Sequence, residues 1–236
     1  MISLGLMGFG AGGWGGAMVT AAGTTLLLAV LGFSAGAVFG TLAAWARIAG
    51  PLPVRWLADG YTTVLRGIPD LLVIYLFYFG GSVALSAMGQ AFGAQGFIGM
   101  PALATGTIAL GVISGAYQAE VYRGAFGAVP RGQIEAGRAV GMSRALLFRR
   151  IVAPQVLRYA VPGLGNVWQL VLKESALVSV TGLVELLRQS QIGAGSTREP
   201  FPFYITAAIL YLVITTVSTW GFGRLERRTL RGERRA

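Results

Sequence analysis

Five long runs of apolar residues dominate this 236-residue sequence. The hydrocarbon core of a bilayer is about 30 Å thick, and a helix needs about 20 apolar residues to cross it. Only 12% of the residues are charged, roughly half of what is usual in a soluble domain. The sequence therefore predicts an all-α integral membrane protein with about five transmembrane helices. We expect them at approximately residues 17–45, 63–88, 101–122, 159–183 and 203–222.

The distribution of basic residues predicts the orientation, because Lys and Arg are retained on the cytoplasmic side. With the N-terminus outside, sixteen of the nineteen fall in inner segments. These are Arg47, Arg55, Arg66, Arg123, Arg131, Arg138, Arg144, Arg149, Arg150, Arg158, Arg224, Arg227, Arg228, Arg231, Arg234 and Arg235. We therefore expect a periplasmic segment at 1–16, one transmembrane domain at 17–222 and a basic cytoplasmic tail at 223–236. This topology accounts for the net charge of +10 without nucleic-acid binding.

Cysteine and histidine are both absent from the sequence. Without cysteine the chain has no disulfide and no thiolate metal site. Without histidine it lacks the residue that most often serves as a general base. It also contains no GxxxxGK[ST] sequence for binding nucleotide phosphates. We expect no catalytic, cofactor or metal site in this chain, and a membrane-embedded enzyme is the least favoured class.

Small residues recur at intervals of four in two of the expected spans. Gly32, Gly36 and Gly40 form a tandem GxxxG pattern, and Gly111 and Gly115 repeat it. Such patterns let two helix backbones approach closely. We favour packing within the chain over a subunit interface.

The most informative segment is the connection at 130–154, PRGQIEAGRAVGMSRALLFRRIVAP. It predicts a short helix after Pro130 with Glu135 in an early turn, where the helix dipole favours an anion. Gly141 suits a left-handed C-cap and Ser143 an N-cap for a second helix beginning at Arg144. Pro154 is expected to end or kink that helix. A helix pair at the inner membrane face is expected to dock a partner, the alternative being a basic loop that anchors on lipid headgroups.

This segment resembles the EAA loop of permease subunits of ATP-binding-cassette (ABC) importers. The resemblance rests on the spacing of Glu135, Ala136, Gly137, Gly141, Ile151 and Pro154. Two positions depart from the family pattern, with Gly137 in place of the second Ala and Ala153 in place of Leu. The resemblance implies the type I importer fold. It also implies that the first helix is a cytoplasmic coupling helix, which contacts the ATPase subunit between the third and fourth spans.

Further segments are similar to the polar amino acid branch of that family, and most closely to HisQ-like subunits of histidine, lysine–arginine–ornithine and opine importers. They are Arg66-Gly67-Ile68-Pro69, residues 164–169 and residues 173–179. The resemblance implies a permease for polar, cationic amino acids or opines in the bacterial inner membrane. The implied partners are a second homologous permease subunit, which would form a heterodimer, two copies of an ATPase that binds ATP and Mg²⁺, and a periplasmic substrate-binding protein.

Ionisable residues inside the expected spans are candidates for a substrate path, because each costs roughly 2.5–3.5 kcal/mol at the membrane centre. Lys173 and Glu174 are the clearest cases. Asn166 and Gln169 precede Lys173 by seven and four residues, so these three share one helix face. The group could line a polar path or form an interhelical clasp, and the two readings are equally favoured. Glu120 is included as a path or gate candidate, although an ion pair with Arg123 is preferred.

Two other function classes stay open. A secondary transporter or channel for small polar solutes would predict an inverted repeat or a ring of charges within one chain. No convincing repeat is found. A scaffold role would leave Lys173 and Glu174 with a purpose in packing alone.

Overall fold

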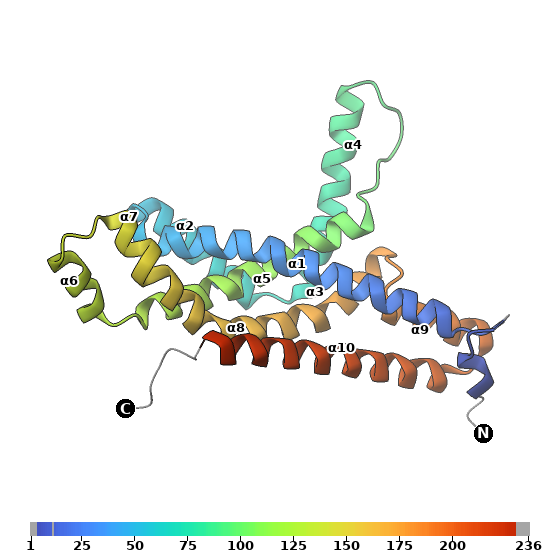
Figure 1. Cartoon of the computed structure of the whole chain (residues 1–236). Helices are drawn as coiled ribbons and strands as arrows, with labels where there is room; N and C mark the ends of the chain where they lie inside the picture. Colours follow the sequence, from blue (N-terminus) through green and yellow to red (C-terminus); the bar gives the residue numbers. More distant parts are fainter. Residues whose placement is uncertain (1–3, 11, 230–236) are drawn as a thin grey trace.

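The computed structural model describes residues 4–10 and 12–229, which form a bundle of helices (Figure 1). The α-helices are α1 (Gly15–Ala49), α2 (Leu52–Gly67), α3 (Asp70–Tyr75), α4 (Gly81–Ala91), α5 (Ala102–Gly127), α6 (Arg131–Ala139), α7 (Arg144–Leu147), α8 (Ala153–Glu174), α9 (Leu186–Thr197) and α10 (Pro200–Thr229). The 3₁₀ segments are η1 (Leu4–Met7) and η4 (Ser175–Thr181), and the π segments are η2 (Leu76–Gly80) and η3 (Phe148–Val152).

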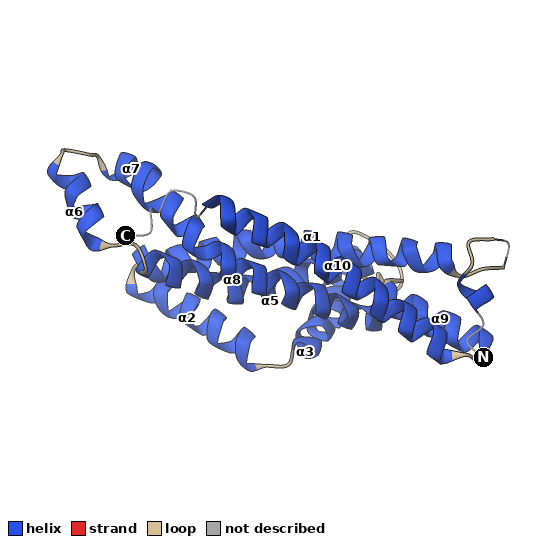
Figure 2. Ribbon diagram, turned by 60° about the horizontal axis from the view of Figure 1, so that its bottom comes forward, coloured by secondary structure: helices blue, strands red, loops and turns tan. Residues whose placement is uncertain are grey.

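Within the described residues, four helical segments are long and apolar enough to cross a membrane. They cover 15–49, 70–91, 102–127 and 200–229. The fourth expected span corresponds to α8, which packs against α5 and α10 (Figure 2) but carries Arg158, Lys173 and Glu174. The all-helical membrane fold is confirmed, while the count of five crossings and their direction stay predictions. Of the expected tail, Arg231, Arg234 and Arg235 lie outside the described residues.

The tightest packing in the bundle joins α1 to α5, along the glycines that the sequence singled out. A Cβ atom added at Gly36 would collide with Ser114 Oγ, and one added at Gly115 would lie 2.7 Å from Phe39 Cβ. The hydroxyl of Ser114 donates to the Gly32 carbonyl oxygen across this contact at 3.2 Å. Packing within the chain, rather than between subunits, is therefore confirmed for this pattern.

Replacing Gly36 with valine is expected to destabilise the bundle by about 1–3 kcal/mol, as overpacking usually does. The new side chain would separate α1 from Ser114 and Gln118 of α5. Thermal unfolding of the purified protein in detergent measures the effect. Gly23→Val is the matched control, since nothing lies within 4 Å of a Cβ atom there. Equal melting temperatures for the two variants would contradict this account of the interface.

The second expected span begins later than the sequence predicts. Residues 63–67 end the separate helix α2, Ile68 is extended (φ −108°, ψ 151°), and the apolar helix starts at Asp70. Pro69 explains the break, because it lacks an N–H and disfavours helical conformation in the preceding residue.

Tyr61 fixes α2 to α5 by donating to the Val112 carbonyl oxygen at 2.6 Å. Burial raises the pKa of this phenol to about 12.

α4 follows the π segment η2 and projects from the bundle, across its long axis (Figure 1). Two serines hold the return loop against this arm. Ser82 Oγ accepts from Met100 N and Ser86 Oγ accepts from Ile98 N, both at 2.9 Å. The backbone stays helical through η2 (φ −62°, ψ −43° at Gly80), so the apolar run 70–91 is one continuous helical segment.

The fourth expected span also ends differently, because the α-helix stops at Glu174 and continues as η4 to Thr181. Gly182 then takes a left-handed conformation (φ 89°) and the chain enters α9. Glu185 is fully buried and caps α9, accepting from Arg188 N at 2.7 Å and Leu187 N at 3.0 Å. Thr25 and Tyr211 donate to the same carboxylate, each at 3.3 Å. This carboxylate therefore joins α9 to α1 and α10.

Candidate functional site

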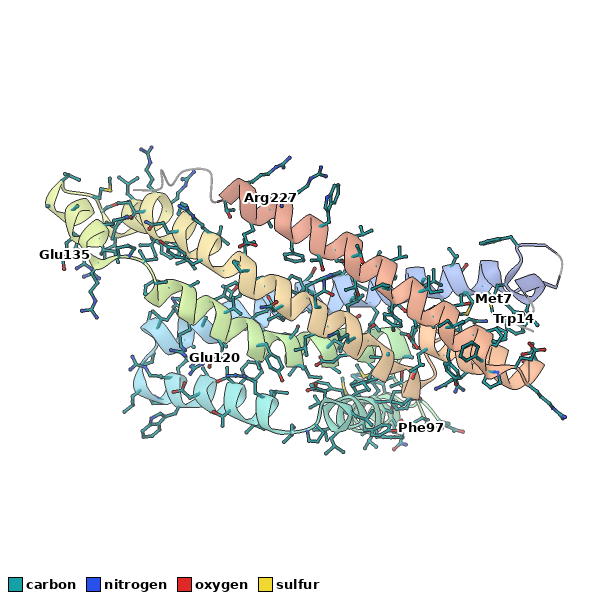
Figure 3. The ribbon with its side chains drawn as sticks, turned by 90° about the horizontal axis from the view of Figure 1, so that it is seen from below. Met7, Trp14, Phe97, Glu120, Glu135 and Arg227 are labelled. Atoms are coloured by element: carbon teal, nitrogen blue, oxygen red, sulfur yellow. The ribbon has the colours of Figure 1, made fainter. Side chains whose placement is uncertain are left out.

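The expected helix pair in the 130–154 segment forms α6 and α7 at one end of the molecule. Glu135 of α6 lies at the end opposite to Met7 and Trp14 (Figure 3). Gly141 has a φ of 79°, the left-handed C-cap that the sequence predicted. Ser143 Oγ accepts from Leu146 N at 3.3 Å and so caps α7. The two expected caps are confirmed. Glu135 is exposed and lies beyond the first turn of α6, which holds no acidic residue.

Four of the six candidate coupling residues meet at one hollow of about 480 Å³ on the inner side of this helix pair. Ala136 and Gly137 contribute from α6, Ile151 from η3 and Pro154 from α8. A Cβ atom at Gly137 would collide with Leu147 Cδ1 and lie 3.0 Å from Ile151 Cδ1. The departure from alanine at this position therefore suits the close packing of α6 on η3.

The sequence predicted that Pro154 either ends or kinks the second helix. The structure rules out the first alternative, because the helix does not end there. Helical structure runs without a break from Arg144 through Glu174, and the π segment η3 directly precedes the proline. A π turn relieves the missing hydrogen bond and the steric conflict that a proline brings into a helix. Gln155 of α8 also donates from Nε2 to Gln133 Oε1 of α6 at 2.7 Å, which links the two arms.

The polar residues of α8 divide between two sides of the helix. Asn166 and Lys173 are exposed, and Gln169 between them donates from Nε2 to Thr219 Oγ1 of α10 at 3.1 Å. Glu174 instead is buried, with 7% of its surface exposed. The structure thus confirms the shared face of Asn166, Gln169 and Lys173 but places Glu174 apart from it.

Buried polar atoms without a hydrogen-bond partner are concentrated on α8. Within the described part of the chain, Trp168 Nε1, Gln169 Oε1 and Glu174 Oε2 all lack one. Buried polar groups are normally paired, and each exception needs an explanation. Trp168 and Gln169 are adjacent in α8, whereas Glu174 lies on another side of that helix and has the carboxyl group of Asp70 as its neighbour.

Asp70 was interpreted from the sequence as a structural residue at a helix start, and it does lie in the first turn of α3. Its carboxyl group also lies next to that of Glu174. Arg66 stacks nearby over the ring of Tyr117, 5.6 Å from its centroid. The sequence signal for this pair was an acidic residue at the start of an apolar run. Its meeting with Glu174 could not be seen, because 104 positions separate them and only tertiary packing joins α3 to η4 and α5.

Glu120 lies in a cluster of ion pairs at the ends of α1, α2 and α5, which we call the ion cluster (Arg47, Asp59, Arg66, Glu120 and Arg123; Figure 3 labels Glu120). The predicted pair with Arg123 is confirmed, with 2.7 Å between Glu120 Oε2 and Arg123 Nη2. Glu120 Oε1 also contacts Arg47, which reaches Asp59 Oδ1 at 2.5 Å. The structure brings Glu120 together with these cations and not with the α8 residues.

Replacing Glu120 with glutamine is expected to lower stability by about 1–3 kcal/mol, because it leaves the buried side of Arg47 without its main partner. The half-maximal substrate concentration for uptake should stay unchanged, since the ion cluster joins helices away from the α8 face. Thermal unfolding and initial uptake rates measure the two effects separately. A large change in substrate affinity at normal stability would instead indicate that Glu120 belongs to the substrate path or its gate.

Comparison with known proteins identifies the family and the fold. Residues 36–231 match the family described as "Binding-protein-dependent transport system inner membrane component". The chain belongs to this family. It is 58% identical over 230 residues to the octopine transport system permease protein OccQ of Rhizobium meliloti, covering 98% of this chain and 97% of that protein. It is 42% identical over 224 residues to the histidine/lysine/arginine/ornithine transport system permease protein HisQ of Escherichia coli, covering 95% and 98%.

A solved structure shares the fold. A chain of an amino acid ABC transporter with histidines superimposes with a TM-score of 0.78 at 33% identity, covering 91% of this chain and 95% of that one. Membership in the family makes this protein a multi-pass inner-membrane permease subunit of an ABC importer, and in such systems the ATPase and the substrate-binding protein are partners.

Proposed function

We propose that this chain forms half of the translocation path of an importer for cationic amino acids or opines. The observation that carries the proposal is the meeting of Asp70 and Glu174, two carboxyl groups from different helices, at a largely buried place in the bundle. Two adjacent carboxyl groups in a poorly solvated place disfavour double ionisation, so either a proton or a cation between them relieves the repulsion. An ammonium or guanidinium group is the cation that a transported amino acid can supply.

The rest of α8 suits the other end of such a substrate. Lys173 carries a positive charge next to Glu174, and Gln169 and Asn166 extend the polar face toward the cytoplasmic end. A carboxylate passing along this face would meet Lys173 first and amide groups afterwards. The names of the relatives point to the same chemistry, since lysine, arginine and ornithine have cationic side chains.

The partners follow from the incomplete path. A second homologous permease subunit would supply the other half and make a heterodimer, two ATPase copies would bind ATP and Mg²⁺, and a periplasmic protein would deliver the substrate. The connection at 92–101 carries no charged residue, so capture of a free solute is better assigned to a separate protein. This chain would then need no cofactor of its own and perform no hydrolysis.

We infer that Glu135, Ala136, Gly137, Gly141, Ile151 and Pro154 together build the coupling element. The exposed α6 would contact the ATPase, while the packing of Gly137 on Leu147 and Ile151 would pass its displacement to α8. Support comes from the match to the importer family and from the continuous helix that joins this hairpin to Glu174.

Reconstitution tests the function directly. The chain is combined in proteoliposomes with its second permease subunit, its ATPase and its binding protein, and uptake of radiolabelled arginine and octopine is followed. We expect uptake to require internal ATP and the binding protein and to resist proton ionophores. Uptake driven by a proton gradient in the absence of ATP would instead support the secondary transporter.

A further inference from the structure

The largest hollow among the prominent pockets of the described structure lies far from Asp70 and Glu174, between the C-terminal ends of α1 and α5 and the start of α8. It measures about 650 Å³, within the range of small-ligand sites, about 300–1,000 Å³. We call it the α1–α8 groove, and its rim includes the exposed residues Trp45, Phe148 and Leu157. The hollow is large enough to hold a ligand, and none of the candidate coupling or path residues lines it.

The walls of the groove are suited to a hydrocarbon. They carry no charged side chain, and the hydroxyl groups of Thr41 and Tyr122 already have partners within the chain. Thr41 Oγ1 donates to the Ala37 carbonyl oxygen at 2.6 Å, and the Tyr122 hydroxyl donates to Gln118 Oε1 at 3.0 Å. The walls therefore offer mainly apolar contact, while the indole N–H of the exposed Trp45 is a hydrogen-bond donor at the rim.

The charge beside the groove indicates the other end of the occupant. Arg144 precedes Phe148 by four residues and so lies on the same side of the helix, and Arg149 follows Phe148 directly. Both arginines are exposed, and no acidic side chain forms an ion pair with either of them within the described residues. An apolar groove with an aromatic rim beside unpaired arginines matches a molecule with an apolar chain and an anionic head.

We propose that the α1–α8 groove binds an acyl chain of an anionic phospholipid, whose headgroup phosphate pairs with Arg144 and Arg149. The lipid would fill the space between the end of α1 and the start of α8, next to the coupling hairpin. Tryptophan and tyrosine at a membrane–water interface favour this level of the bilayer, and arginine pairs well with phosphate oxygens.

Native mass spectrometry of the purified transporter complex tests the proposal. The complex is incubated in detergent with phosphatidylglycerol or with phosphatidylcholine of the same acyl chains, and the retained lipid is counted. We expect the complex to retain phosphatidylglycerol at least fivefold more than phosphatidylcholine. Equal retention of the two lipids would overturn the proposal.

Two variants locate the site, each with a matched control. Thr41→Trp fills the groove from an exposed position of α1, whereas Leu42→Trp adds the same side chain to the neighbouring exposed residue, which does not line the groove. Arg144→Gln with Arg149→Gln removes the headgroup charges, and Arg198→Gln removes one charge elsewhere. We expect retained phosphatidylglycerol to fall at least fivefold in the two test variants and to stay within twofold of wild type in the controls.

The same preparation separates other occupants. If Thr41→Trp releases the second permease subunit on size exclusion and leaves lipid retention unchanged, the groove is a subunit interface and the lipid proposal fails. If Thr41→Trp and Leu42→Trp retain the same amount of phosphatidylglycerol, the lipid binds elsewhere and the proposal also fails.

Discussion

Uptake of cationic substrates should fall at least tenfold when Glu174 is replaced by glutamine. The substitution removes one of two adjacent carboxylates at nearly constant volume, and a hydrogen bond to a charged group contributes about 1.5–3 kcal/mol. Since 1.4 kcal/mol corresponds to a factor of ten, we expect the half-maximal substrate concentration to rise by about tenfold or more. Initial rates of arginine uptake over a range of concentrations measure it.

Glu226→Gln is the matched control, because it removes a carboxylate from the C-terminal end of α10. Its uptake rate should equal that of the wild type. The clasp interpretation makes a different prediction for Glu174→Gln, namely a lower melting temperature with unchanged substrate affinity. That outcome would remove the substrate contact from the proposed function while leaving the family assignment in place.

Glu135→Lys is expected to abolish at least nine-tenths of transport while the protein still inserts into the membrane. Glu135 is exposed on α6 and makes no contact that holds the bundle together, so folding should not suffer. At a protein interface, juxtaposed like charges cost several kcal/mol, and a reversed charge here would weaken ATPase docking. Co-purification of the ATPase and the ratio of ATP hydrolysed to substrate imported are the measurements.

The control for charge alone is Glu226→Lys, which makes the same change at the C-terminal end of α10. Normal ATPase association and uptake in Glu135→Lys would show that α6 is not the coupling helix. A loss of insertion in Glu135→Lys would instead show that the exposed position in the bundle is misassigned.

The sequence predicted the helix pair at 130–154 well because its signals are local. Gly141 needs a left-handed backbone and Ser143 caps the next turn, and both effects act within a few residues. The contact of α1 with α5 was also foreseen as packing within the chain, since GxxxG patterns specify close approach of two helices. Such features depend on neighbours in sequence or on a repeated pattern.

Features that depend on distant contacts were missed or misplaced. Arg47 and Asp59 were not connected with Glu120, because an ion cluster among three helices leaves no spacing pattern in one sequence. The start of the second span was placed too early because hydropathy continues through Ile68 while Pro69 breaks the helix. Asp70 was judged by its place at a helix start, and its neighbour Glu174 arrives from another part of the chain.

The π segment before Pro154 has a mechanical consequence. It lets helical structure continue through Pro154, so that the chain follows a helical path of about 45 Å from Arg144 to Glu174 at 1.5 Å per residue. This path is not straight, because α8 also contains Pro162 and the segment changes direction between α7 and the rest of α8 (Figure 1). If α6 is displaced by a partner, the displacement would therefore reach Glu174 along continuous helical backbone, without an intervening loop to absorb it.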